Sequence, residues 1–284
     1  MGTERYEVGL IGAGIAASLS PALHEREAGR LRLDYAYRLI DIDERGLGPG
    51  DVGELVEQAH RGGFSGLNVT HPCKQAVVPL LDALSEDAAA LRAVNTVVFD
   101  DGRAIGHNTD TTGFAESFAR GLPGAPVRSV VLLGAGGAGT AIAHAALRLG
   151  VQRLTIVDVE PERARACARQ LASDRITAGT LDSLAGADGL IHATPTGMEG
   201  HDPGLPLDEE RLHPGLWVAD IVYRPLETEL LQRARELGCR TLDGGGMAVF
   251  QAADSFELFT GVQPDRERML RHFSELVGQT VSAA

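Results

Sequence analysis

One segment constrains the fold of this chain more than any other: an apolar strand that leads directly into a run of glycines and then into a helix. The strand is expected at residues 130–133, the glycine run reads Gly-Ala-Gly-Gly-Ala-Gly at 134–139, and helix-forming residues fill 140–147. A lone Gly-x-Gly-x-x-Gly pattern is weak evidence, but a strand before it and a helix after it meet the requirement of a dinucleotide-binding turn. Glycines let a ligand approach the backbone, and the helix N-terminus offers N–H groups to a pyrophosphate. The segment therefore predicts a dinucleotide site.

An acidic residue, Asp158, ends the next predicted strand at 154–157. A carboxylate there can accept hydrogen bonds from both hydroxyls of the adenosine ribose, and it repels a 2′-phosphate. NAD is therefore favoured over NADP. Two alternatives stay open, because Asp158 could instead cap the helix that opens at Pro161, and Arg163 lies where it could meet a phosphate.

A second glycine run, 9–14, also follows a predicted strand and imitates the same pattern. Its continuation differs, because Pro21 suits the first turn of the next helix while Ser18 and Ser20 offer hydroxyls to a small polar ligand. We expect this turn to serve a substrate rather than a second nucleotide.

Strand-like and helical stretches alternate along the chain, which favours βαβ units with mainly parallel sheets. The first series has strands expected at 7–11, 35–40 and 66–69, helices at 21–30, 52–61 and 77–84, and a hairpin formed by 94–99 and 103–106. After a helix at 110–121, the second series has strands at 130–133, 154–157, 189–192 and 216–220 and helices at 139–149, 161–172 and 226–237. The predicted class is α/β, with an N-terminal domain at 1–106, a dinucleotide-binding domain at 107–246, and amphipathic C-terminal helices at 247–284 that return to the first domain.

Charge and composition exclude several classes of function. The net charge of −13 disfavours nucleic acid and anionic lipid as partners. The chain has no cationic leader and no apolar run of about 20 residues, so a cytoplasmic protein is expected. Cys73, Cys167 and Cys239 form no Cys-x-x-Cys pair, so neither a metal site nor a disulfide framework is indicated; a nucleophilic Cys73 would need a nearby base.

Three polar stretches, 68–74, 93–96 and 106–110, end strands or open helices in the first series. Together they supply a lysine, a carboxylate, amides and hydroxyls, which could hold a polyhydroxylated acid and move a proton. Each stretch alone has a structural explanation, since Asn and Thr commonly form turns, Asp110 could cap its helix, and a lysine is usually a solvated charge.

Taken with the Ser-Leu-Ser-Pro-Ala-Leu-His stretch at 18–24, these motifs resemble the shikimate dehydrogenase family, and closely its NAD-dependent quinate/shikimate dehydrogenase branch. The resemblance spans nearly the whole chain and continues through 134–139, 193–198, 220–225 and 243–251. It implies a substrate-binding α/β domain facing a Rossmann domain across a cleft, oxidation of a ring alcohol of quinate or shikimate, and a place in aromatic amino acid biosynthesis.

The resemblance also implies residue roles. Ser18 and Ser20 would bind the substrate carboxylate, and the catalytic pair would be Lys74 and Asp110. The residues implied around the ring hydroxyls are Thr70, Lys74, Asn95, Asp110 and Gln251. Those implied at the cofactor are Gly134, Gly136, Gly137 and Ala138 at the glycine turn, Asp158 and Arg163 at the adenosine end, and Thr194, Pro195, Val222, Tyr223, Gly244 and Met247 near the nicotinamide.

Two departures from the family pattern bear on these roles. NADP-using members usually carry a basic cluster after the second Rossmann strand, whereas 157–162 here is acidic, which favours NAD. The histidine of the first motif is followed by Glu25 instead of the common Asn, so position 25 is given no role.

The implied chemistry is hydride transfer to the nicotinamide with loss of the hydroxyl proton. Lys74 can accept that proton if burial favours its neutral form, while Asp110 nearby would favour the ammonium, so the pair acts as a unit. Two other functions stay open. One is another two-domain NAD(P) oxidoreductase, such as a methylenetetrahydrofolate dehydrogenase-like enzyme. The other is a non-catalytic dinucleotide-sensing module, which the presence of both Lys74 and Asp110 disfavours. The preference between quinate, shikimate and aminated analogues stays open too, as does the choice between monomer and homodimer.

Overall fold

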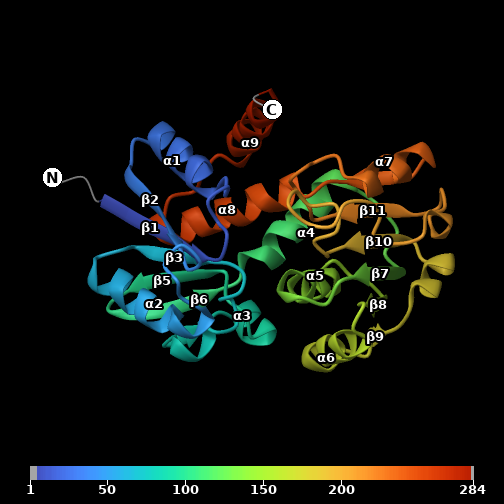
Figure 1. Cartoon of the computed structure of the whole chain (residues 1–284), viewed down its shortest axis with the longest axis horizontal. Coiled ribbons are helices and arrows are strands. Elements are labelled where there is room, and N and C mark those ends of the chain that lie inside the picture. The colour runs from blue at the N-terminus through green and yellow to red at the C-terminus, as the bar shows by residue number, and fades with distance from the viewer. Residues whose placement is uncertain (1–4, 283–284) are drawn as a thin grey trace. The chain divides into compact units, whose positions relative to one another are not determined.

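The computed structural model describes residues 5–282 and divides into two compact units (Figure 1). One unit runs to Thr109 and resumes at Val249, and the other is Asp110–Ala248. The polar start of the sequence, 1–4, lies outside the described residues. Each unit has its own sheet and its own apolar core, so the predicted two-part α/β class is confirmed.

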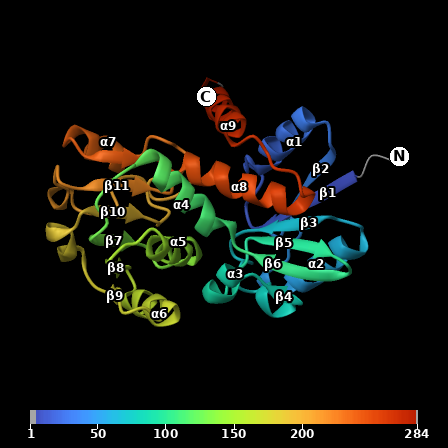
Figure 2. The same ribbon diagram turned by 180° about the vertical axis from the view of Figure 1, so that it is seen from behind.

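The first unit contains a six-stranded sheet in the order β2-β1-β3-β5-β6-β4. Its strands are β1 (Arg5–Gly12), β2 (Asp34–Asp41), β3 (Gly66–Val69), β4 (Ala83–Leu84), β5 (Thr96–Asp100) and β6 (Arg103–His107). The neighbours β1, β2 and β3 are parallel, whereas β5 runs antiparallel to β3 and β6. The expected hairpin is thus present, and its two strands lie side by side in Figure 2.

Two helices of this unit follow from sequence pattern, and a third was not predicted. Helix α1 (Ser20–Leu31) has its proline in the first turn, as expected. Helix α2 (Val52–Arg61) buries Val52, Leu55, Val56 and Ala59, a spacing that forms one apolar face. Helix α3 (Glu86–Leu91) was not predicted, although Ser85 caps it by accepting a hydrogen bond from the Ala88 N–H at 3.3 Å.

The helix predicted at 77–84 is wrong. The chain forms only a short 3₁₀ turn, Val78–Leu80, and then the strand β4. Pro79 cannot continue a helix because it lacks a backbone N–H and disfavours the α conformation in the residue before it. Pairing of Ala83 and Leu84 with Ile105 and Gly106 on β6 then favours the strand.

The C-terminal tail, which was predicted to be helical, forms two helices, α8 (Gly245–Thr260) and α9 (Arg266–Ser282). The break contains Gly261, whose φ of 67° ends α8, and the following proline prevents its continuation. Helix α9 packs against α1 (Figure 1), where the fully buried Glu27 carboxylate accepts hydrogen bonds from the guanidinium of Arg268.

The second unit contains a six-stranded parallel sheet in the order β12-β11-β10-β7-β8-β9. Its strands are β7 (Ser129–Leu133), β8 (Arg153–Val157), β9 (Ile176–Ala178), β10 (Gly189–His192), β11 (Trp217–Asp220) and β12 (Arg240–Leu242). The helices are α4 (Thr109–Gly121), which begins in the first unit, α5 (Gly137–Arg148), α6 (Pro161–Leu171) and α7 (Glu229–Glu236). β9 and β12 were not predicted because three-residue strands carry little pattern.

Strand order reverses at β7, which pairs with β8 on one side and β10 on the other. In open parallel sheets, ligands bind beyond the carboxyl ends of the strands at such a reversal. The glycine run follows β7 directly, so topology and sequence indicate the same edge of the sheet. Among the residues that the structure describes, no helix has both the length and the apolar character needed to cross a membrane.

Candidate functional site

The glycine turn after β7 uses its first and last glycines for close packing and its middle glycines for open space. Gly134 has a φ of 106°, and a Cβ there would lie 2.6 Å from the Ala193 carbonyl oxygen. A Cβ on Gly139 would lie 2.1 Å from the carbonyl oxygen of Gly134, so α5 could not begin so close to the strand with any other residue. At Gly136 and Gly137 a Cβ would meet nothing within 4 Å. The turn is therefore closely packed against the protein at Gly134 and Gly139, and it leaves open space at Gly136 and Gly137.

Helix α5 begins inside this turn. Its N-cap is Gly136, which has no side chain that could cap the helix, and the helix continues through Ala138. The Thr140 N–H donates to the Gly136 carbonyl at 2.9 Å, which closes the first helical turn. The first N–H groups of a helix have no partner within the helix, so this start suits an anion.

Asp158 closes the turn from the end of β8. One of its oxygens accepts the Ala135 N–H at 2.8 Å, and the other accepts the Glu160 N–H at 2.9 Å. Asp158 is not the N-cap of α6; that position is Glu160, which makes no side-chain cap. Arg163 is exposed and forms an ion pair with Glu160 at 2.8 Å.

The predicted nicotinamide residues lie at the carboxyl ends of β10 and β11 or at the start of α8. Buried His192 contacts the Thr194 hydroxyl through Nε2, and its Nδ1 lies 2.9 Å from an Asp220 carboxylate oxygen. The same oxygen of Asp220 accepts the Val222 N–H at 3.0 Å, so one buried pair anchors both loops. The sequence analysis gave no role to His192 or Asp220; the signals for them were two polar residues that end adjacent apolar strands and the position of Asp220 at the start of the 220–225 stretch.

The other predicted nicotinamide residues, Pro195, Tyr223, Gly244 and Met247, lie close in sequence or in space to the loops that follow β10 and β11. A Cβ on Gly244 would lie 2.3 Å from the Ile221 carbonyl oxygen, so only glycine fits there. Burial raises the pKa of the Tyr223 phenol, an effect that Arg224 partly offsets. Pro195 follows Thr194 directly, and Met247, in the first turn of α8, packs on the core of the second unit.

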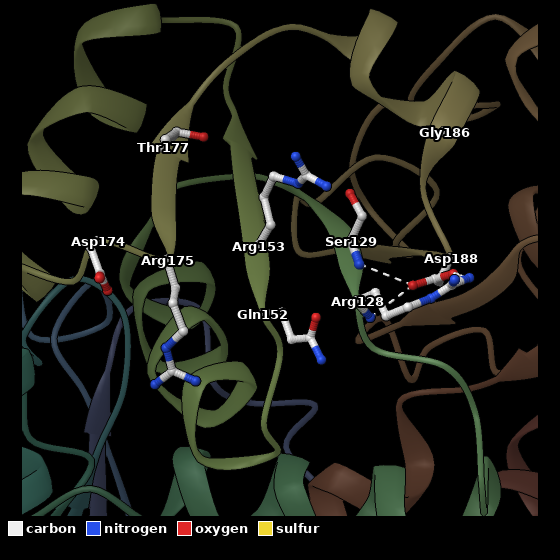
Figure 3. Close-up of a pocket in the computed structure, with 9 residues that line it drawn as sticks. All are labelled: Arg128, Ser129, Gln152, Arg153, Asp174, Arg175, Thr177, Gly186 and Asp188. Atoms are coloured by element: carbon white, nitrogen blue, oxygen red, sulfur yellow. Dashed lines mark hydrogen bonds and ion pairs between the residues drawn. The ribbon is translucent and has the colours of Figure 1, made fainter.

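A polar pocket of about 620 Å³ lies at the opposite, amino ends of β7, β8 and β9 (Figure 3). Asp188 there accepts the backbone N–H groups of Arg128 and Ser129 at 2.7 and 2.9 Å, and also the Arg128 guanidinium at 2.7 Å. Because ligands of parallel sheets bind at the carboxyl ends, this pocket is not the dinucleotide site.

In the first unit, the loop that carries Ser18 and Ser20 is held by Asp41 at the end of β2. The buried Asp41 carboxylate accepts the N–H groups of Gly14 and Ile15 at 3.2 and 2.8 Å. Burial alone would raise the pKa of this carboxyl, but its backbone hydrogen bonds outweigh that effect and hold the pKa below its ordinary value. Ser18 Oγ in turn accepts the Ser20 N–H at 3.3 Å.

Lys74 lies in the turns that follow β3, next to the fully buried Cys73, whose thiol pKa is raised by burial. The Lys74 carbonyl accepts the Val94 N–H at 2.8 Å, which fixes the lysine backbone to the residue before Asn95. Thr70 begins the same segment, and its N–H donates to the Ile11 carbonyl at 2.9 Å.

The Asn95 side chain fixes the start of α4. Its Oδ1 accepts the Thr109 N–H at 2.8 Å, and its Nδ2 donates to the Thr109 hydroxyl at 2.9 Å. That hydroxyl donates to the carbonyl of Gln251 at 3.0 Å. Asp110, the next residue of α4, is 6% exposed and lies in the first turn, where the helix dipole favours a negative charge.

Two buried polar residues that sequence reasoning did not select, Tyr37 and Asn68, connect these groups. The Tyr37 hydroxyl donates to Asn68 Oδ1 at 2.8 Å, and Asn68 Nδ2 donates to the Asn95 carbonyl at 3.3 Å. Burial raises the pKa of Tyr37, which a hydrogen bond with Ser20 partly offsets. Asn68 was visible in the sequence as part of the 68–74 stretch, whereas Tyr37 is one aromatic residue in a strand and carried no signal.

Comparisons with known proteins agree with this arrangement. The shikimate dehydrogenase substrate binding domain matches residues 10–97, and the shikimate 5′-dehydrogenase C-terminal domain matches residues 244–272. A shikimate dehydrogenase (NADP⁺) of Streptomyces avermitilis is 63% identical, over 98% of both chains. A quinate/shikimate dehydrogenase (NAD⁺) of Corynebacterium efficiens is 48% identical, over 95% of this chain and 98% of that one.

Among solved structures, quinate dehydrogenase from Corynebacterium glutamicum in complex with NAD is similar with a TM-score of 0.90 and 44% identity, over 95% of this chain and 99% of that one. Matches of this extent and identity show more than a shared fold. They exclude the methylenetetrahydrofolate dehydrogenase-like alternative and confirm the resemblance inferred from the motifs. The chain is an oxidoreductase that uses a nicotinamide dinucleotide, and it belongs to the shikimate dehydrogenase family.

Proposed function

We propose that this enzyme is an NAD-dependent quinate/shikimate dehydrogenase, which transfers a hydride between NAD and a ring secondary alcohol to give 3-dehydroquinate or 3-dehydroshikimate. The observation that carries the cofactor choice is the Asp158 carboxylate, which is hydrogen-bonded into the glycine turn at Ala135. Of the three similar proteins described above, one is named for NADP and two for NAD, so the choice depends on this chain's own residues.

Charge decides between the two cofactors. Each Asp158 oxygen accepts one backbone N–H and keeps lone pairs that can accept the ribose hydroxyls. Two unit charges at 4 Å interact by about 1 kcal/mol in water and about 4 kcal/mol near a protein surface, and a 2′-phosphate would meet this carboxylate as a like charge. Arg163 is the opposing influence, but it is exposed and already paired with Glu160. Repulsion by Asp158 therefore outweighs attraction by Arg163.

The substrate is assigned to the first unit's polar residues. Ser18 and Ser20 donate to the substrate carboxylate from the loop that Asp41 holds. Thr70, Asn95 and Gln251 bind ring hydroxyls together with the catalytic pair. The side-chain oxygen Oδ1 of Asn95 already accepts the Thr109 N–H and the Thr96 hydroxyl, so a hydrogen bond from the Asn95 side chain to a substrate would come from Nδ2.

Proton movement is assigned to Lys74 and Asp110. The bound nicotinamide supplies the hydride acceptor for alcohol oxidation. Lys74 Nζ takes the proton that the hydroxyl loses, and the Asp110 carboxylate stabilises the ammonium that forms. The second-unit residues Thr194, Pro195, Val222, Tyr223, Gly244 and Met247 shape the nicotinamide end, where the His192–Asp220 pair keeps the loops fixed.

Steady-state kinetics with quinate and shikimate, each with NAD and NADP, test the proposal. We expect kcat/KM to favour NAD by at least about tenfold, a difference of about 1.4 kcal/mol. Asp158→Asn should reduce this preference in two ways. It should lower kcat/KM with NAD, because it weakens the contact with the ribose hydroxyls, and it should raise kcat/KM with NADP, because it removes the repulsion of the 2′-phosphate. Arg163→Ala is the matched control on the same segment and should leave NAD use unchanged. Equal use of both cofactors by the wild type, or an unaltered ratio in Asp158→Asn, would contradict the assignment.

A further inference from the structure

We propose that His192 and Asp220 are positioning residues for the nicotinamide dinucleotide, because they fix the Thr194 side chain against the first glycine of the turn after β7. All of these residues lie in the second unit. The inference rests on the proposed function, in which the dinucleotide lies at the glycine turn and beside Thr194. It deepens that function by assigning separate tasks to the two oxygens of one buried carboxylate.

The pair joins the ends of two neighbouring strands of the parallel sheet (Figure 1). His192 ends β10 and Asp220 ends β11, and the register of these strands places the two residues side by side. Both side chains are 0% exposed. An ionised carboxylate can only accept, so the imidazole Nδ1 carries the proton that is shared across 2.9 Å. This bond fixes the orientation of the ring and turns its other nitrogen, Nε2, toward Thr194.

The Thr194 side chain is fixed on two sides. Its hydroxyl is hydrogen-bonded to His192 Nε2, and it also lies 3.4 Å from the N–H and 3.3 Å from the hydroxyl of Thr196. Its methyl group lies against the glycine turn, since a Cβ on Gly134 would be 3.0 Å from Thr194 Cγ2. Hydroxyl and methyl are attached to the same branched carbon, so the bond to His192 determines where the methyl lies.

This contact bears on the dinucleotide because the glycine turn has a packed side and an open side. Thr194 supports the packed side at Gly134, while Gly136 and Gly137 leave open space for the ligand. A turn that is held in place before binding does not have to be ordered by the ligand, which favours affinity. His192 and Asp220 touch no cofactor in this scheme; they act through Thr194.

The other oxygen of Asp220 has a different task. It accepts the Thr228 hydroxyl at 2.7 Å, and Thr228 caps α7 by accepting the Leu231 N–H at 3.4 Å. One oxygen of the carboxylate therefore holds a helix, and the other orients His192 toward Thr194. This separation supplies a matched control.

His192→Asn separates the two hydrogen bonds of the imidazole. The new amide N–H can take the place of Nδ1–H and still donate to Asp220, but no atom replaces Nε2 beside Thr194. We expect the Kd of the dinucleotide that the wild type prefers to rise about three- to tenfold in a calorimetric titration, and its KM to rise in parallel. The KM for quinate and shikimate should stay within about twofold and kcat within about threefold. An unchanged dinucleotide Kd would overturn the proposal.

Thr228→Val is the matched control. It removes a hydroxyl that is bonded to the same carboxylate and also caps α7, so it should lower the melting temperature at least as much as His192→Asn does. Its dinucleotide Kd should nevertheless stay within about twofold of wild type. If Thr228→Val weakens dinucleotide binding as much as His192→Asn does, a general loss of stability explains the effect and the positioning role is wrong.

A double-mutant cycle shows whether His192 acts through Thr194. Thr194→Val removes the hydroxyl and keeps the branched shape, and in this background His192→Asn should change the dinucleotide Kd by less than about twofold. Full additivity of the two changes would overturn the positioning role while leaving the proposed function intact. Thr194→Val without any effect on the Kd would instead contradict the proposed place of Thr194 at the cofactor, and with it this inference.

Discussion

The chain contains two glycine turns that follow a parallel strand, and a carboxylate from the neighbouring strand closes each of them. After β1, Asp41 accepts the N–H groups of Gly14 and Ile15; after β7, Asp158 accepts that of Ala135. The difference lies in what comes next. Helix α5 has its N-cap at Gly136, inside its turn, whereas α1 begins only at Ser20, after an intervening loop.

That difference explains why one turn suits a dinucleotide and the other a small acid. A helix that starts inside the turn brings its N–H groups and the positive end of its dipole to the place where a phosphate lies. When the helix starts later, an intervening loop presents its side chains instead, here Ser18 just before the helix and Ser20 at its first position. The two carboxylates differ accordingly: Asp41 is buried and accepts three backbone N–H groups, while Asp158 is half-buried and accepts two.

The largest expected effect is a loss of turnover without a loss of cofactor affinity. If Lys74 of the first unit takes part in the reaction and the second unit binds the dinucleotide, Lys74→Ala should lower kcat by about 10²- to 10⁴-fold, the usual contribution of a general acid or base. Fluorescence titration should show nearly unchanged NAD affinity. A variant that keeps more than about a tenth of wild-type turnover at every pH would remove Lys74 from the mechanism.

Alanine at one glycine of each turn compares the two turns directly. Gly139→Ala places a Cβ 2.1 Å from the Gly134 carbonyl oxygen, so α5 must shift, and we expect NAD to bind at least about tenfold more weakly. Gly14→Ala meets no atom within 4 Å and costs only the strain of a φ of 62°, about 1–2 kcal/mol of stability. Calorimetric NAD titrations check this, and equal NAD affinities of the two variants would show that the turns are equivalent.

The smallest expected effect concerns stability in acid. Asp41→Asn should lower the free energy of unfolding by about 1–3 kcal/mol, because buried N–H groups lose their acceptor. Asp158→Asn should lower it by less. Since the folded-state pKa of Asp41 is lowered, its contribution is complete above the unfolded value of 3.8 and is lost as pH falls below it. Thermal melts across that range should show a weaker acid dependence for Asp41→Asn than for wild type. Parallel profiles would mean that Asp41 does not govern this loop.

Local pattern was sufficient where an element's own residues determine its structure. The strand at 66–69, the helix at 52–61 and the strand at 189–192 have the predicted bounds, because an apolar run or an apolar helical face identifies each. The pattern failed at 77–84, where Pro79 and pairing with β6 outweigh helix propensity. The predicted site roles stay predictions, since they are carried by motif order and await the kinetics described above.

By itself the sequence determined the two glycine turns, the acid that ends the strand after the second of them, and the order of polar motifs that indicates the family. Tertiary structure alone decided which buried polar groups meet. Tyr37 and Asn68 are far apart in sequence, as are His192 and Asp220, yet each pair is hydrogen-bonded at 2.8 and 2.9 Å. The physical reason is that a buried polar group must find a partner, and folding, not local pattern, determines which partner lies within reach.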